Sequence, residues 1–270
     1  TDARFSLTVQ AGEATGWGAA AHRSIDHLRV QERTLTAIDK AKRGLEVCEL
    51  PPGRYTVILE PAAVAGLWSS LLWTLDAKSY EKGTSALSGK LGQPIVDKRL
   101  TFRNLPAHED LLGIGFTTNG LPTVASDWIA DGVLTQLAYD RFTAKVRGID
   151  KIPTLDAPCL SGTGPSLPTL QELIKHTESA ILVTNFWYIR TVNPTDLTLT
   201  GMTRDGTFLV ENGAIVSAVK NFRFHESPLR VFNRIAAFTN PAEAITSETG
   251  KLLVPAMTLR DFNFSSVTRF

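Results

Sequence analysis

The sequence predicts an α+β fold, in which a β-rich C-terminal domain of antiparallel sheets with one buried helix follows the remnant of an α/β domain. After Tyr80, short runs of alternating apolar and polar residues are separated by Gly, Asn, Asp and Pro, which is typical of antiparallel strands and hairpins. The segment 61–73 is apolar on nearly every face, which indicates a helix buried in a core. A helical pattern over 29–45 precedes the Pro-Pro-Gly turn at 51–53, where we place the main boundary.

Two domains are expected on either side of that boundary. Residues 1–49 are interpreted as the tail of an N-terminal α/β domain, and residues 50–270 as the β-rich domain. Within the tail, the alternation over 5–9 predicts a strand, and the glycines between 12 and 18 predict a turn. The chain begins at Thr1 rather than at Met, and a strand-like segment starts almost at once, so we expect a C-terminal portion of a longer protein.

The β-rich part is expected to open with a strand over 55–59, and Pro61 suits the first turn of the buried helix that follows. The Asp-Gly at 205–206 and the Asn-Gly at 212–213 predict hairpin turns, because both dipeptides accept positive φ angles. The remaining periodic segments predict strands over 94–102, 123–129, 133–139, 181–192, 197–202, 207–211, 214–224 and 257–264, and helices over 169–177 and 229–238.

The charge balance gives no sign of a nucleic-acid partner. Lys and Arg number 28 against 27 Asp and Glu, a net charge of +1, and the chain has no basic run, so we expect no direct nucleic-acid binding. No apolar stretch reaches the ~20 residues that span a bilayer, so no membrane partner is expected. The two cysteines, Cys48 and Cys159, cannot form a disulfide framework, which favours a cytoplasmic protein.

One group of aromatic and charged residues is a candidate peptide groove. It comprises Trp187, Tyr188 and Arg190 in a strand-like run, with Arg204 and Asp205 in the turn expected to follow. A groove lined by these residues could hold an extended peptide by adding it to a sheet as a further strand. The alternative interpretation is that the aromatic side chains are ordinary core and rim residues of a sheet.

A second candidate is a catalytic site of another kind. His225 and Glu226 lie between a predicted strand and a predicted helix, and Cys159 lies in a loop-like segment. Histidine, carboxylate and thiol are the groups that general acid–base and nucleophilic catalysis use. No third member of a catalytic set is identifiable from the sequence, and Cys159 has no base near it in the chain, so ordinary structural roles remain the alternative.

From residue 50 onward the chain resembles the TldD/PmbA (TldE) family. The resemblance covers roughly residues 50–265, and its motifs follow one another in the family's order. They are Tyr55-Thr-Val-Ile-Leu-Glu-Pro61, Gly83-Thr-Ser85, Gly89-Lys-Leu-Gly-Gln93, Gly120-Leu-Pro-Thr123, Ile129-Ala-Asp-Gly-Val-Leu134, Thr143-Ala144 and Thr203-Arg-Asp-Gly-Thr-Phe-Leu-Val-Glu-Asn-Gly213. Each motif alone is weak, and the specificity comes from their ordered succession.

The resemblance implies a cytosolic bacterial or archaeal protein with an N-terminal α/β portion and a C-terminal β-rich domain. In this family the TldD member is a zinc metallopeptidase that pairs with TldE to degrade unfolded or short peptides. The family was first labelled a modulator of DNA gyrase, and it matures certain peptide antibiotics.

The chain departs from the family pattern at the start of the buried helix. TldD carries His-Glu-x-x-x-His there, with a cysteine near its C-terminus. Alignment on the preceding strand places Glu60 at the first histidine, Pro61 at the glutamate and Ala65 at the second histidine, and no cysteine follows Cys159. Proline and alanine offer no lone pair to a metal, and one carboxylate cannot supply the three protein ligands of a catalytic zinc.

The resemblance and its departure together suggest a TldE/PmbA-like, non-zinc subunit of a TldD/TldE-type peptidase complex. We expect no catalytic or metal-binding residues in this chain, no cofactor of its own, and zinc only in a TldD-type partner. Two alternatives remain open at this point. One is an independent homodimeric protein that binds peptides or acts as a scaffold, and the other is an enzyme that uses His225 or Cys159.

Overall fold

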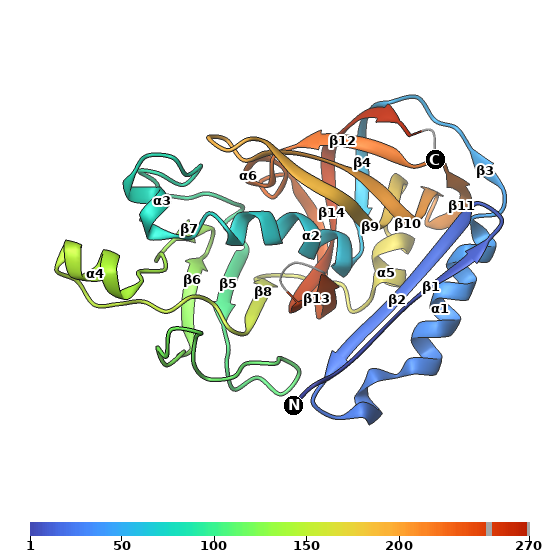
Figure 1. Ribbon diagram of the computed structural model, residues 1–270. Coiled ribbons are helices and arrows are strands. Elements are labelled where there is room, and N and C mark those ends of the chain that lie inside the picture. Colours follow the sequence, from blue (N-terminus) through green and yellow to red (C-terminus); the bar gives the residue numbers. More distant parts are fainter. Residues whose placement is uncertain (247–249, 269–270) are drawn as a thin grey trace.

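A computed structural model describes residues 1–246 and 250–268. It consists of a small N-terminal unit and a large mixed sheet, which lie side by side in Figure 1. The small unit is a hairpin of β1 (Ala3–Ala11) and β2 (Ala14–His22), followed by a 3₁₀ turn (Ile25–Leu28) and α1 (Val30–Arg43). Helix α1 packs on the hairpin and buries Ala37 and Ala41.

The sequence predicted a turn for the glycines between 12 and 18, but most of this segment is strand. Only Gly12, at φ +59°, lies in the turn between the two strands, while Gly16 and Gly18 belong to β2. A Cβ on Gly18 would lie 2.6 Å from the carbonyl oxygen of Arg33, and one on Gly16 would overlap the backbone of Ala37. These glycines therefore allow the strand to approach α1 closely, a use of glycine that local sequence does not distinguish from a turn.

The large sheet is built mostly from antiparallel pairs, and it confirms the predicted α+β, β-rich fold class. Its strand order is β3-β11-β10-β9-β4-β14-β8-β5-β6-β7, with β12 and β13 paired onto β14 beside this path. The parallel pairs are β4 with β9, β8 with β14 and β3 with β11. The bounds are β3 (Val47–Cys48), β4 (Gly53–Leu59), β5 (Leu100–Asn104), β6 (Ser126–Ala130), β7 (Val133–Leu134), β8 (Pro158–Gly162), β9 (Ser179–Asn193), β10 (Thr198–Glu211), β11 (Ala214–Val219), β12 (Phe222–Glu226), β13 (Ile235–Thr246) and β14 (Gly250–Val267).

The buried helix of the prediction is α2 (Pro61–Leu72), which crosses the face of the sheet in Figure 1 and contacts β9, β13 and β14. Pro61 occupies its first turn, where the missing N–H costs nothing. The Trp68 ring packs edge-on against Phe102 and Phe232, with ring centroids 5.4 and 5.0 Å apart. The other helices are short: α3 (Ala77–Glu81), α4 (Arg141–Arg147), α5 (Leu170–Lys175) and α6 (Pro228–Val231).

Two further predictions about the β-rich part are wrong. The Asp-Gly at 205–206 is not a hairpin turn, because β10 continues through it and the register with β9 shifts between Arg204 and Thr207. The positive φ angles of this dipeptide therefore serve a β-bulge. The predicted helix over 229–238 ends at Val231, and the apolar residues from Ile235 onward form β13.

Other elements agree with the sequence. The Asn-Gly at 212–213 does form the turn between β10 and β11, with φ angles of +49° and +78°. The predicted strands over 197–202 and 207–211 are the two halves of β10, and the one over 94–102 is strand only from Leu100. Among the residues that the structure describes, no helix is long and apolar enough to cross a membrane.

Asp97 anchors the segment before β5 to the rest of the sheet. Its carboxylate accepts hydrogen bonds from the Arg99 side chain at 2.7 and 2.9 Å, and Arg99 also donates to the carbonyl of Ile235 at 2.7 Å. The Arg99 hydrogen bonds lower the pKa of Asp97 below its ordinary value. Because the folded-state pKa is lowered, this interaction contributes stability above the unfolded-state pKa of about 4 and loses it as the pH falls through the folded-state pKa.

We therefore expect Asp97→Asn to lower the free energy of unfolding at pH 7 by about 1.5 kcal/mol, the worth of a hydrogen bond to a charged group. The difference from the unmutated protein should shrink below pH 4, as measured by urea unfolding across pH. Asp150→Asn, at an exposed position, is the control and should change little. A deficit of Asp97→Asn that does not change with pH would contradict this account.

Candidate functional site

The N-terminus of α2 lies where the small unit meets the large sheet. The backbone N–H of Glu60 donates to the carbonyl of Val183 in β9 at 3.0 Å, and the carbonyl of Glu60 accepts the first helical hydrogen bond from Val64. Glu60 is thus held between the end of β4 and the start of α2, in extended conformation. This placement directs its side chain toward α1.

The carboxylate of Glu60 is engaged by a cation of the protein itself. Its Oε2 lies 2.6 Å from Nζ of Lys40 in α1, and its Oε1 accepts a hydrogen bond from Oγ1 of Thr184 at 3.1 Å. The Glu60 and Lys40 side chains are each only 13% exposed. Because the pair is this close and this well shielded, removing either partner would leave the other charge buried without a counter-ion, which is costly.

The residues at this position do not fit a catalytic zinc. Pro61 and Ala65 carry no donor atom, and the one carboxylate present is already neutralised by Lys40. Within residues 1–246 and 250–268, no three His, Cys, Asp or Glu side chains lie together in a way that could hold a metal ion. A catalytic zinc needs three protein ligands and an open position, which this set does not provide.

A second buried charge cluster lies beside the first and is centred on Glu243 of β13. Its Oε2 pairs with Arg33 of α1 at 2.9 Å, and its Oε1 lies 3.1 Å from Nζ of Lys251 in β14 and accepts the backbone N–H of Ala21 at 3.0 Å. The two clusters border one cavity of about 240 Å³. Together they join α1 and β2 to α2 and to the large sheet.

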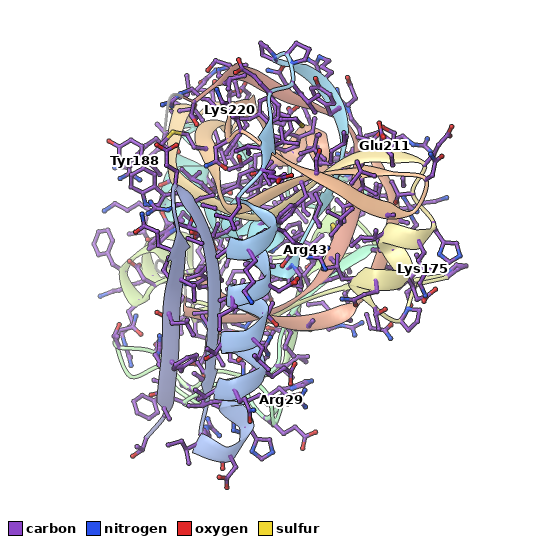
Figure 2. All side chains as sticks on the ribbon, turned by 90° about the vertical axis from the view of Figure 1, so that its right-hand side faces the viewer. Arg29, Arg43, Lys175, Tyr188, Glu211 and Lys220 are labelled. Carbon is purple, nitrogen blue, oxygen red and sulfur yellow. The ribbon has the colours of Figure 1, made fainter. Side chains whose placement is uncertain are left out.

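A second cavity, of about 320 Å³, also borders the hairpin. Its walls come from β1 and β2 (Thr8, Trp17), from α2 (Gly66, Ser69), from β9 and β10, and from the end of β13. Four of the five predicted groove residues line it, namely Trp187, Tyr188, Arg204 and Asp205. Figure 2 shows Tyr188 at the outer border of the molecule, near the ends of the hairpin strands.

Two arginine side chains lie over aromatic rings at or beside this cavity. The guanidinium carbon of Arg204 lies 4.5 Å from the centroid of the Trp187 ring, and that of Arg190 lies 4.2 Å from the centroid of the Tyr188 ring. Arg190 itself lines a neighbouring cavity. The structure therefore brings the predicted groove residues together, with Trp187 and Tyr188 about half exposed rather than in the core.

One edge of β9 has no paired strand beside this cavity in the described part of the protein. On one side β9 pairs with β10 over most of its length, but on the other it pairs with β4 only from Ile181 to Val183. After Leu59 the chain leaves the sheet to form α2, so in the described part of the chain no strand pairs with this second edge of β9 from Asn185 onward. An open strand edge of this kind can accept an added strand.

The alternative catalytic residues are not brought together. Cys159 in β8 pairs with Leu253 of β14, whereas His225 follows Phe224, which pairs with Phe264 of the same strand. Those two positions are separated by roughly 35 Å of strand, at ~3.3 Å per residue. Glu226 is buried and accepts from the backbone N–H of Ser227 and from Arg230, which is a structural role.

Sequence reasoning missed Lys40, Thr184 and Trp17. Lys40 precedes Glu60 by twenty residues and was assigned to the other domain, so no local pattern links the two. The available signal was the helical spacing of Ala37 and Ala41, which places Lys40 near the face of α1 that packs against the protein.

We expect Lys40→Met to lower the free energy of unfolding by about 3 kcal/mol, because it leaves the Glu60 carboxylate buried without its cation. Adding Glu60→Gln should recover most of that loss, since the amide needs no counter-ion. The measurement is urea unfolding of the two single variants and the double variant. Equal and additive losses would show that the pair does not act as a unit.

Burial raises the pKa of the Cys159 thiol and so keeps the reactive thiolate scarce. We expect iodoacetamide to alkylate half-buried Cys48 well before Cys159 in the folded protein, as followed by peptide mass spectrometry. His225→Ala should leave the Cys159 rate unchanged. A fast Cys159 reaction that slows in His225→Ala would revive the alternative catalytic site.

Comparison with known proteins identifies relatives of the same architecture. The structure of TldE from Thermococcus kodakarensis matches with a TM-score of 0.85 at 18% sequence identity. The match covers 97% of this chain and 62% of the TldE chain. Proteins named as modulators of DNA gyrase, from Bacteroides thetaiotaomicron and Thermotoga maritima, have TM-scores of 0.81 and 0.83 at 22% and 20% identity. They cover 98% and 97% of this chain and 60% and 61% of their own lengths. At these identities the likeness shows the fold alone.

A relative at the sequence level is a metalloprotease from Methanothermobacter thermautotrophicus, 24% identical over 144 residues, which are 53% of this chain and 32% of that protein. The chain therefore spans less than two thirds of the length of each of these relatives. The family model described as the PmbA/TldA metallopeptidase C-terminal domain matches residues 52–266, which is most of the chain. The predicted resemblance is thereby confirmed, and the chain belongs to the PmbA/TldA metallopeptidase family.

Proposed function

We propose that this chain is a TldE/PmbA-like, non-zinc subunit of a TldD/TldE-type metallopeptidase complex that acts on unfolded or short peptides. The observation that carries the proposal is the Lys40–Glu60 ion pair at the start of α2. The family model covers this helix, while the position where the zinc motif would begin holds a carboxylate paired with Lys40. Zinc and the hydrolytic step then belong to a TldD-type partner.

The role proposed for this chain is to hold peptide rather than to cleave it. The open edge of β9 offers backbone hydrogen-bonding groups to an extended chain, and Trp187 and Tyr188 offer apolar area beside it. Backbone pairing is insensitive to sequence, which suits the binding of unfolded or short peptides. The expected cytoplasmic location and the expected partner remain parts of this proposal.

The test combines metal analysis with a peptidase assay. Elemental analysis of the purified chain should find no stoichiometric zinc, and the lone chain should not cleave casein or short peptides. Cleavage should appear with a His-Glu-x-x-x-His paralogue from the same genome, and the same partner with its motif glutamate changed to glutamine is the control. Stoichiometric zinc together with activity in the lone chain would overturn the proposal.

The oligomeric state separates this proposal from its alternative. Co-purification should give a complex of this chain with the paralogue, whereas an independent homodimeric scaffold would form only self-pairs. Exclusive self-association in the presence of the paralogue would therefore favour the scaffold and contradict the proposed complex.

A further inference from the structure

One oxygen of the Asp205 carboxylate is buried without a hydrogen-bond partner in the described part of the protein. Asp205 is 6% exposed, and its Oδ1 atom has no hydrogen bond within the described part of the protein. The nearest cation is its chain neighbour Arg204, whose Nε lies 3.8 Å away, beyond hydrogen-bond distance. An ionised group withdrawn from water is costly unless it is paired, so this carboxylate is poised for a partner that arrives from outside.

The backbone holds Asp205 in this position. The residue sits in the bulge of β10 with φ +59°, and Gly206 follows with φ +124°. Bulges redirect side chains, and non-glycine residues in the left-handed region recur at functional sites. Asp205 lines two cavities. One is the 320 Å³ cavity that Trp17 and Trp187 also line, and the other has a volume of about 380 Å³.

The walls of the 320 Å³ cavity, which Trp17 and Trp187 line, suit a positively charged group. Trp17 of β2 and Trp187 of β9 contribute aromatic surface, and the Trp187 ring already holds the guanidinium of Arg204 at 4.5 Å. Aromatic faces attract cations, and indole does so most strongly. Among the described residues that line this cavity, only Arg204 and Asp205 carry a charge, and Asp205 is the anionic one.

We propose that Asp205 and the two tryptophans form a subsite for a cationic group of a bound peptide, either a Lys or Arg side chain or a free α-amino group. The inference rests on the peptide-holding role proposed above and names the substrate class of that groove. Arg204 is 42% exposed, so its side chain can move toward solvent when the ligand's cation approaches Asp205. Arg204 then acts as a competitor that weakens the subsite.

The test measures binding of capped alanine-rich peptides to the protein by calorimetry. One peptide carries a central Lys, the second carries Gln at that place, and the third is the Gln peptide with a free α-amino group. The unmutated protein should bind at least one cationic peptide about tenfold to hundredfold more tightly than the neutral one, as a hydrogen bond to a charged group implies. The arm that gains affinity identifies the source of the cation.

Two variants should move this preference in opposite directions. Asp205→Asn should abolish it, and it should fold because Asn tolerates a positive φ as well as Asp does. Arg204→Gln should strengthen it by removing the competing cation. The matched control is Asp131→Asn, which makes the same change at another aspartate with positive φ, in the turn between β6 and β7. Thermal unfolding confirms that each variant is folded.

The failures of the two proposals are distinguishable. If the three peptides bind the unmutated protein equally and Asp205→Asn changes nothing, the cationic subsite is wrong while the peptide groove stands. If none of the peptides binds, the peptide-holding function itself fails and the subsite falls with it. Weaker cation binding in Arg204→Gln would also overturn the inference.

Discussion

The ion pair between Lys40 and Glu60 joins the small N-terminal unit to the large sheet at the start of α2. Glu60 cannot move, because its backbone bonds to β9 on one side and starts α2 on the other. Its carboxylate is largely shielded from water, and such a charge requires a positive partner. Lys40 meets that requirement from α1, so the arrangement of the small unit on the large sheet depends on this contact and on the neighbouring Glu243 cluster.

The small unit in turn creates the cleft. Glycines at 16 and 18 let β2 approach α1, and the unit formed in this way packs against β10 and β13 of the large sheet. Its strands then form one wall of the cavity that Trp187 and Asp205 line from the opposite side. A chain that retained only residues 52–266, the part that the family model matches, would lack Trp17 and Lys40 and would leave this cavity without that wall.

A single change of direction after Leu59 produces both functional features of the large sheet. When the chain leaves β4 to form α2, it places Glu60 at a helix start and, in the described residues, leaves one edge of β9 without a paired strand from Asn185 onward. The first feature holds the Lys40–Glu60 ion pair, and the second is the strand edge on which the proposed peptide binding depends.

The sequence by itself determined the β-rich α+β class, the apolar helix with Pro61 in its first turn, and the family, because alternation, all-round apolarity and ordered motifs are local properties of the chain. Four of the residues that it grouped as a candidate groove, Trp187, Tyr188, Arg204 and Asp205, line one cavity, since they lie on two strands that follow one another in the sequence. It misjudged the Asp-Gly at 205–206 and the glycines of β2, because a positive φ or a missing Cβ serves a turn, a bulge or a close contact equally well. Only the tertiary structure decided that Lys40 neutralises Glu60 and that Cys159 and His225 lie apart. Both depend on which distant segments become neighbours in the fold. An ion pair between residues twenty positions apart produces no repeating pattern in the sequence.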